Sequence, residues 1–217
     1  TYCLINLADR ISIKKIRNRS SDKLYFTGPF AKDVKKSKNS VQKILKILRE
    51  HKLITNYFSV KVQKNVPVYA GLGGGTSNAA SVLNYLCRKK INKKLLNKAI
   101  EISGSDMRLF LFNQGYMENL QTISPFKKKH KLYFLIVFPK IKSSTKEVYS
   151  KLKKYSAKKK FQRNRLKKKQ FFINYISKTK NDLQSIVEKK HPLIRELLTN
   201  IRSYQGCFFS KMTGSGS

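Results

Sequence analysis

The sequence predicts a globular protein built from both helices and strands, and three observations support this. Alternating apolar residues from Tyr57 to Gln63 are typical of a strand, whereas apolar residues from Val41 to Leu48 recur at helical spacing. A glycine cluster at Gly71 to Gly75 runs directly into a second helical repeat. With 217 residues, 40% of them hydrophobic, the chain is long enough to bury one good core or two small ones.

The N-terminal half contains most of the clear periodic segments. Strands are expected at residues 3–7, 11–13 and 57–63, and helices at 41–48, 79–86 and 92–103. Asn39 or Ser40 is a candidate cap for the first helix, and a short apolar segment covers Leu109 to Phe112. Strand, glycine loop and helix in this order form the layout of a phosphate-binding site.

The C-terminal half follows a lysine-rich segment, FKKKHK, so a domain boundary near residue 128 is expected, with domains at 1–127 and 128–217. Here strands are expected at Leu132–Phe138 and Cys207–Ser210. Helices are expected at Ser144–Leu152 and behind Pro192, where apolar residues repeat at helical spacing.

The charge is unusual, because 48 basic residues against 11 acidic ones give a formal net charge of +37. Such a balance raises a nucleic-acid partner as one reading. Only ten of the basic residues are Arg, and lysine-rich composition also follows from AT bias in a genome. A basic insertion at 151–170 carries eleven Lys or Arg and no acid, which is typical of a solvated helix face or a mobile loop.

The cysteines and the hydropathy indicate in which cellular compartment the protein is expected. Cys3, Cys87 and Cys207 are odd in number and widely spaced, so neither a disulfide framework nor a zinc site is indicated. The longest apolar run, Leu132 to Phe138, is far too short to cross a bilayer. We therefore expect a cytoplasmic protein with no membrane partner.

The glycine loop is the most informative stretch of the chain. Glycines let backbone N–H groups face phosphate oxygens, and a helix that begins just after them adds the positive end of its dipole. The hydroxyls of Thr76 and Ser77 lie where they could cap that helix or contact a phosphate or its Mg²⁺. The candidate nucleotide-binding residues are Pro67, Val68, Tyr69, Ala70, Gly71, Leu72, Gly73, Gly74, Gly75, Thr76 and Ser77.

Better-known glycine loops do not fit this stretch. A Walker A loop needs Lys before the Ser/Thr, but Gly75 precedes Thr76. The dinucleotide and protein-kinase fingerprints both fail where Thr76 replaces glycine. A glycine-rich turn without a ligand is the alternative, although four glycines within five residues are costly unless something approaches the backbone closely.

The loop resembles that of the GHMP kinases, and in detail their diphosphocytidyl-methylerythritol branch, which reads P-x-G-x-G-L-G-G-G-S-S-N-A-A. The resemblance continues in order along the chain. Its further elements are Ser103-Gly104-Ser105-Asp106, Phe138-Pro139 with Ser144 to Tyr149, Asn181-Asp182-Leu183, and Met212-Thr213-Gly214-Ser215-Gly216. Several ordered matches over nearly the whole chain identify it as similar to this branch.

The resemblance implies an α/β fold in two layers (α+β), with a ribosomal-protein-like N-terminal domain that binds ATP and a ferredoxin-like C-terminal domain. It implies Asp106 as the catalytic base, although a turn cap is the alternative on local grounds. ATP with Mg²⁺, held in part by Ser77, is the implied phosphoryl donor. The implied acceptor is a small molecule, the C2 hydroxyl of cytidine-diphosphate methylerythritol. The implied substrate-binding residues are Thr145, Asn181, Gly214, Ser215 and Gly216, and a helix cap explains Thr145 equally well.

Several departures from the family pattern leave alternatives open. Tyr69 stands where the family has Gly, and Met107-Arg108 replace its usual Val-Pro. The chain also begins after the family's P-A-K-x-N-L motif, which supplies a catalytic Lys, and ends before the family's last strand and helix. We therefore expect either a piece of a longer protein or a decaying gene. The readings are an active kinase, a non-catalytic relic and a basic RNA-binding protein. No specific nucleic acid is expected, and the oligomeric state stays open between monomer and homodimer.

Overall fold

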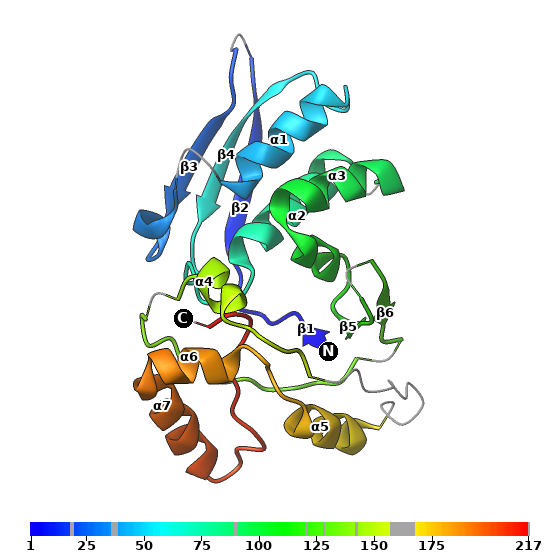
Figure 1. Ribbon diagram of the computed structural model, residues 1–217. Helices are drawn as coiled ribbons and strands as arrows, with labels where there is room; N and C mark the ends of the chain where they lie inside the picture. Colours follow the sequence, from blue (N-terminus) through cyan, green and yellow to red (C-terminus); the bar gives the residue numbers. More distant parts are fainter. Residues whose placement is uncertain are drawn as a thin grey trace. The chain divides into compact units, whose positions relative to one another are not determined.

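The computed structural model describes residues 1–17, 20–35, 39–88, 91–119, 121–127, 129–141, 143–156 and 168–216. The chain forms two compact units (Figure 1). The first contains Thr1–Val68 and Gly73–Lys129, and the second contains Tyr69–Leu72 and His130–Ser217. The tip of the glycine loop therefore belongs to the second unit, and the two ends of the loop belong to the first.

The described residues of the first unit form two small sheets. One has the order β2-β4-β3, in which β2 (Arg10–Ile16) pairs antiparallel and β3 (Lys23–Thr27) pairs parallel with the central strand β4 (Tyr57–Gln63). The other has the order β1-β5-β6 and is antiparallel, with β1 at Tyr2–Cys3, β5 at Gln114–Met117 and β6 at Ile123–Pro125.

Among the described residues of the first unit, three segments form α-helices: α1 (Ser40–Glu50), α2 (Gly74–Leu86) and α3 (Lys93–Ser103). The Asn39 side chain caps α1 by accepting from the Gln42 N–H at 2.9 Å, and Asn92 caps α3 in the same way through Leu95 at 2.8 Å. Short 3-10 helices lie at η1 (Ala31–Asp33) and η3 (Ser105–Leu111). Local capping chemistry thus sets where α1 and α3 begin.

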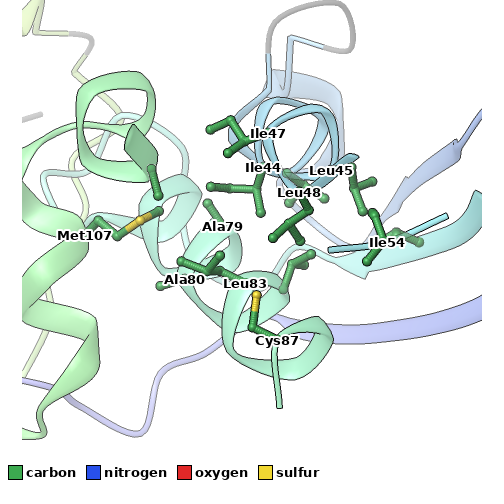
Figure 2. Packing of buried hydrophobic residues seen from close by; sticks show 14 of the residues in the cluster. Ile44, Leu45, Ile47, Leu48, Ile54, Ala79, Ala80, Leu83, Cys87 and Met107 are labelled. Atoms are coloured by element: carbon green, nitrogen blue, oxygen red, sulfur yellow. The ribbon is translucent and has the colours of Figure 1, made fainter. Parts of the chain in front are cut away.

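The main core lies between the β2-β4-β3 sheet and the helices. Figure 2 shows the apolar face of α1 meeting that of α2, with Met107 of η3 closing one side. Val60 and Val62 of β4 point into this core, while Lys61 and Gln63 between and beside them are exposed. The alternation in the sequence from Tyr57 to Gln63 therefore corresponds to one buried and one solvated face.

The second unit is helical in its described part, with α4 (Thr145–Ser150), α5 (Lys169–Lys178), α6 (Gln184–Lys190) and α7 (Pro192–Ser203). A smaller core gathers Val148, Leu183, Val187 and Ile194. On the surface Glu147 accepts from Lys190 at 2.6 Å and from Lys151 at 3.0 Å, which lowers the pKa of Glu147 to about 2. This pairing joins α4 to α6.

The expected α/β class is confirmed, and so are the strand at residues 57–63 and the helices of the first unit. Two predictions for the second unit are wrong, because neither Leu132–Phe138 nor Cys207–Ser210 forms a strand. A strand exists only when a neighbour completes its backbone hydrogen bonds, and within the described residues neither segment has a paired neighbouring strand. Near the N-terminus the paired strand is Tyr2–Cys3, so Cys3 is the only residue of the expected strand at 3–7 that it includes. Most of the basic insertion, residues 157–167, lies outside the described part of the chain.

Two expectations concern cysteines and membranes. All three cysteines are free thiols in the structure. Within the described ranges, none of the helices combines the length and the apolarity needed to span a bilayer.

Candidate functional site

The glycine loop leaves the end of β4 and enters α2 through several left-handed backbone positions. Tyr69, Gly71 and Gly73 have φ angles of 65°, 64° and 66°. Glycine adopts this region without steric cost, whereas the Cβ of Tyr69 makes the same conformation unfavourable. A Cβ on Gly73 would also lie 2.8 Å from the ring of Phe110, so that ring would have to shift. The loop conformation explains why two of its glycines are needed.

The loop ends at the N-terminus of α2, where free backbone donors gather. The first N–H groups of a helix have no intrahelical acceptors, and the N-cap residue Gly73 has no side chain that could accept from them. The first helical bond runs from Ser77 N–H to the Gly73 carbonyl at 2.8 Å. Unpaired N–H groups together with the helix dipole favour an anion such as phosphate.

The two hydroxyls at this helix start have structural partners, and neither caps the helix. Thr76 Oγ1 donates to the Ser103 carbonyl at 3.2 Å, and Ser77 Oγ donates to the Gly74 carbonyl at 2.9 Å. Each bond uses the hydroxyl proton and leaves oxygen lone pairs available. A phosphate-bound Mg²⁺ requires an oxygen lone pair, so the Ser77 hydroxyl fits that role chemically.

Asp106 lies in the same unit as this helix start, in the first turn of η3. The turn packs against α2, and it follows directly on the end of α3 that Thr76 contacts. The N-cap of η3 is Gly104, and no side chain caps the turn, so the capping role considered for Asp106 is not observed. Asp106 is exposed, which leaves its carboxylate accessible.

The surroundings of Asp106 favour its neutral form. Desolvation by neighbouring groups raises the pKa of Asp106, and the hydrogen bond from the Ser105 side chain opposes this only in part. A carboxylate with a raised pKa is a stronger proton acceptor than a free aspartate.

In the second unit the loop tip packs against the turn formed by residues 213–216. Thr213 Oγ1 donates to the Gly71 carbonyl at 3.3 Å. A Cβ on Gly71 would lie 2.4 Å from the Thr213 carbonyl oxygen, and one on Gly214 would lie 2.9 Å from the Gly71 oxygen. Both backbones approach too closely for any side chain, so this contact depends on two glycines.

The remaining candidate residues gather around the same turn. Asn181 donates to the carbonyls of Met212 at 3.1 Å and Gly214 at 2.8 Å, and Thr145 Oγ1 lies 2.8 Å from Ser215 Oγ. Ser144, and not Thr145, caps α4. The structure therefore brings Thr145, Asn181 and the glycine turn together, with Asn181 supporting the turn through its amide.

Two polar residues at the loop, Asp9 and Lys64, were not found by sequence reasoning, and a third, Asn78, was matched there only as part of the loop motif. Asp9 forms a buried ion pair with Lys64, and it also accepts from the side chain of Asn78 at 2.8 Å. Nothing near Asp9 in the sequence marks it, because its partners lie more than fifty positions away. Lys64 and Asn78 flank the glycine loop.

The described residues contain no group of three or more His, Cys, Asp or Glu side chains that could hold a metal ion. Such a group is the usual mark of a metal site built by protein alone. A Mg²⁺ that arrives with nucleotide phosphates needs only one or two protein ligands, so this finding is compatible with the role of Ser77.

Comparison with known proteins identifies relatives over almost the entire chain. Residues 39–114 match the GHMP kinases N terminal domain. The 4-diphosphocytidyl-2-C-methyl-D-erythritol kinase of Pelagibacter ubique is 36% identical over 98% of this chain and 76% of its own length. The enzyme of that name from a Sulfurihydrogenibium species is 34% identical over 85% of this chain and 70% of its own.

A solved structure supports the same fold. The crystal structure of a 4-(cytidine 5'-diphospho)-2C-methyl-D-erythritol kinase superposes with a TM-score of 0.63 at 22% identity and covers 97% of this chain and 75% of that one. At this identity the likeness concerns the fold, which is that of the GHMP kinases.

Proposed function

The chain belongs to the 4-diphosphocytidyl-2-C-methyl-D-erythritol kinase family, and we propose that it transfers the γ-phosphoryl group of ATP to the C2 hydroxyl of that small molecule. The product is a phosphomonoester that serves isoprenoid precursor synthesis. The observation that carries the proposal is the similarity to the Pelagibacter ubique enzyme over 98% of the chain. The structure agrees with it, because the glycine loop runs into α2, and α2 packs against the turn that contains Asp106.

The donor side of the reaction falls to the loop between Pro67 and Ser77. Its backbone N–H groups and the α2 N-terminus bind phosphate oxygens and stabilise the charge that they carry. The Ser77 hydroxyl is the residue that would hold Mg²⁺ through its free lone pairs. When bound, that ion supplies neutralisation of phosphate charge. Together these groups orient ATP for in-line transfer.

The acceptor side falls to Asp106. Its carboxylate accepts the proton of the C2 hydroxyl as the hydroxyl oxygen attacks the γ-phosphorus, and ADP leaves from the opposite side. The accessible position of Asp106 and its raised pKa both suit this role. The turn at 213–216 serves as the substrate-binding element of the second unit, together with Thr145 and Asn181, which contact the turn through Ser215 and Gly214.

We propose that residues 1–127, with the α2 N-terminus and Asp106, form the ATP-binding domain of a GHMP kinase and that residues 128–217 form its C-terminal domain. The change of unit after Lys129 supports this division, although Tyr69–Leu72 of the loop belong to the second unit. Free thiols at Cys3, Cys87 and Cys207 suit a reducing compartment, and we assign the protein to the cytoplasm.

The test is acceptor-dependent release of ADP by the full-length protein in the presence of Mg-ATP. We expect turnover with 4-diphosphocytidyl-2-C-methyl-D-erythritol and none with homoserine or mevalonate, which other GHMP kinases phosphorylate. ADP release at the same rate without any acceptor would reject the proposed function.

A further inference from the structure

A single buried carboxylate accepts hydrogen bonds from both ends of the glycine loop. Asp9 Oδ1 accepts from the backbone N–H groups of Asn65 and Val66, each at 2.8 Å. Asp9 Oδ2 accepts from Asn78 Nδ2 at 2.8 Å and from the ammonium of Lys64. Both carboxylate oxygens are therefore fully used.

These donors bracket the loop in the sequence. Asn65 and Val66 immediately precede Pro67, where the loop begins, and Asn78 immediately follows Ser77, where it ends. The loop can change its span only if one of these bonds breaks. Asp9 itself lies just before β2, so the loop ends are tied to the edge of the main sheet.

The polar side chains that contact Asp9 are buried, so each of them needs its hydrogen-bond partner. The side chains of Asp9 and Lys64 are 0% and 4% exposed, and Asn78 is 5% exposed. Burial alone raises the pKa of Asp9, but the hydrogen bonds from Lys64, Val66 and Asn78 outweigh it and hold that pKa below its ordinary value. The carboxylate is thus ionised in the folded protein, and removal of one partner leaves the others without compensation.

The same cluster supports the first turn of α2. A Cβ on Gly74 would lie 3.1 Å from Val66 Cγ1 and 3.3 Å from Lys64 Nζ. Gly74 therefore sits directly on the residues that Asp9 holds. Because residue 74 is a glycine, the N-terminus of α2 can pack directly against the buried cluster that Asp9 forms with Lys64 and Val66.

We propose that Asp9 is a positioning residue for the nucleotide, which sets the geometry of the phosphate loop by holding Lys64, Asn65, Val66 and Asn78. The proposal rests on the proposed function in that the loop is taken to bind ATP phosphates. Asp9 does not touch the nucleotide, and it acts through the separation and orientation of the two loop ends.

Asp22 provides a matched control within the same unit. Its carboxylate accepts from Arg49 Nη2 at 3.1 Å and from the Phe58 N–H at 2.8 Å. Like Asp9, it ties a backbone N–H and a basic side chain to the sheet. Phe58 lies at the start of β4, whereas Lys64 follows its end, so Asp22 acts at the opposite end of the strand from the loop.

The experiment compares Asp9→Asn with Asp22→Asn in the full-length protein, by calorimetric titration with Mg-ATP and by steady-state kinetics. In Asp9→Asn the amide directs a donor at groups that are themselves donors. We expect its affinity for Mg-ATP to fall roughly 10- to 100-fold, the range typical of supporting residues. The KM for the acceptor should change less than about twofold, and Asp22→Asn should keep Mg-ATP affinity within about twofold of wild type.

A second variant, Asn78→Ala, is used in case Asp9→Asn does not fold. It removes one hydrogen-bond donor to Asp9 and leaves the ion pair between Asp9 and Lys64 intact. We expect it to weaken Mg-ATP binding in the same direction and to leave acceptor KM unchanged. Mg-ATP affinity equal to wild type in a folded Asp9→Asn or Asn78→Ala, or an equal loss in Asp22→Asn, would overturn the proposal. Wild-type protein that binds Mg-ATP but phosphorylates nothing would reject the proposed function alone.

Discussion

Asp106 carries the proposed proton transfer, and its surroundings shift its titration in a testable direction. A base must be ionised to accept a proton, so activity falls as the pH decreases through the pKa of this group. Desolvation raises the pKa of Asp106, and its acid limb therefore lies above the value of about 4 for a free aspartate. The group loses function on the acid side only.

The pH dependence of kcat/KM for the acceptor, at saturating Mg-ATP, measures this limb. We expect its midpoint above about 4 in the wild-type full-length protein and no such limb in the residual activity of Asp106→Asn. A limb at the ordinary aspartate value would show that desolvation at this carboxylate has no catalytic consequence.

Tyr69 is a residue in a conformation suited to glycine. Its φ of 65° costs a side chain about 1 kcal/mol or more, and the residue is 47% exposed, so little burial offsets this cost. Tyr69→Gly should therefore raise the free energy of unfolding by about 1 kcal/mol.

Chemical denaturation of wild type, Tyr69→Gly and Tyr69→Ala separates backbone strain from the aromatic ring. Alanine removes the ring but keeps the Cβ, so it should gain little stability. Equal stabilisation by both substitutions would assign the effect to the ring instead of to φ.

At the scale of elements, the contact between the loop tip and the 213–216 turn depends on two facing glycines. Gly71→Ala places a Cβ 2.4 Å from the Thr213 carbonyl oxygen, so loop tip and turn must separate. Gly206 is the matched control, because its φ of 83° is equally left-handed but nothing lies within 4 Å of its Cβ position.

Thermal unfolding and Mg-ATP titration of the two variants test this contact. Gly206→Ala should lose only the cost of its φ, about 1 kcal/mol, with affinity unchanged. Gly71→Ala should lose more stability and also weaken Mg-ATP binding. If the two variants behave alike, the close approach has no energetic role.

The same elements show how far sequence reasoning reaches. The helices of the first unit and the strand at 57–63 were predictable because apolar periodicity and the caps at Asn39 and Asn92 are local signals. The expected strand at Leu132–Phe138 failed because pairing is non-local, and Tyr133 and Leu135 are in fact 81% and 80% exposed. The loop and Asp106 were visible in sequence motifs. Asp9 was not, because its partners meet only through the fold.

At the scale of the whole molecule, the kinase and RNA-binding readings make different predictions about the net charge of +37. In a kinase this charge attracts RNA weakly and without sequence preference. Neutralising part of it should weaken RNA binding equally for all sequences, flatten its salt dependence and leave kinase turnover close to unchanged. The residues to change to Gln are Lys158, Lys159, Lys160, Lys167, Lys168 and Lys169.

Filter binding across a salt series, run beside the kinase assay on one preparation, measures both properties. Tight binding of one RNA at physiological salt, lost on these substitutions, would favour the RNA-binding reading. Uniformly weak binding supports the kinase.

The central claim is phosphoryl transfer to a defined hydroxyl with Asp106 as base. Phosphorus NMR of a reaction between full-length protein, Mg-ATP and 4-diphosphocytidyl-2-C-methyl-D-erythritol tests it directly. We predict a new phosphomonoester at the C2 oxygen that appears in step with ADP, at a rate that Asp106→Asn lowers by a factor on the order of 10² to 10⁴. Inorganic phosphate without the phosphomonoester, or a wild-type rate in Asp106→Asn, would contradict the account.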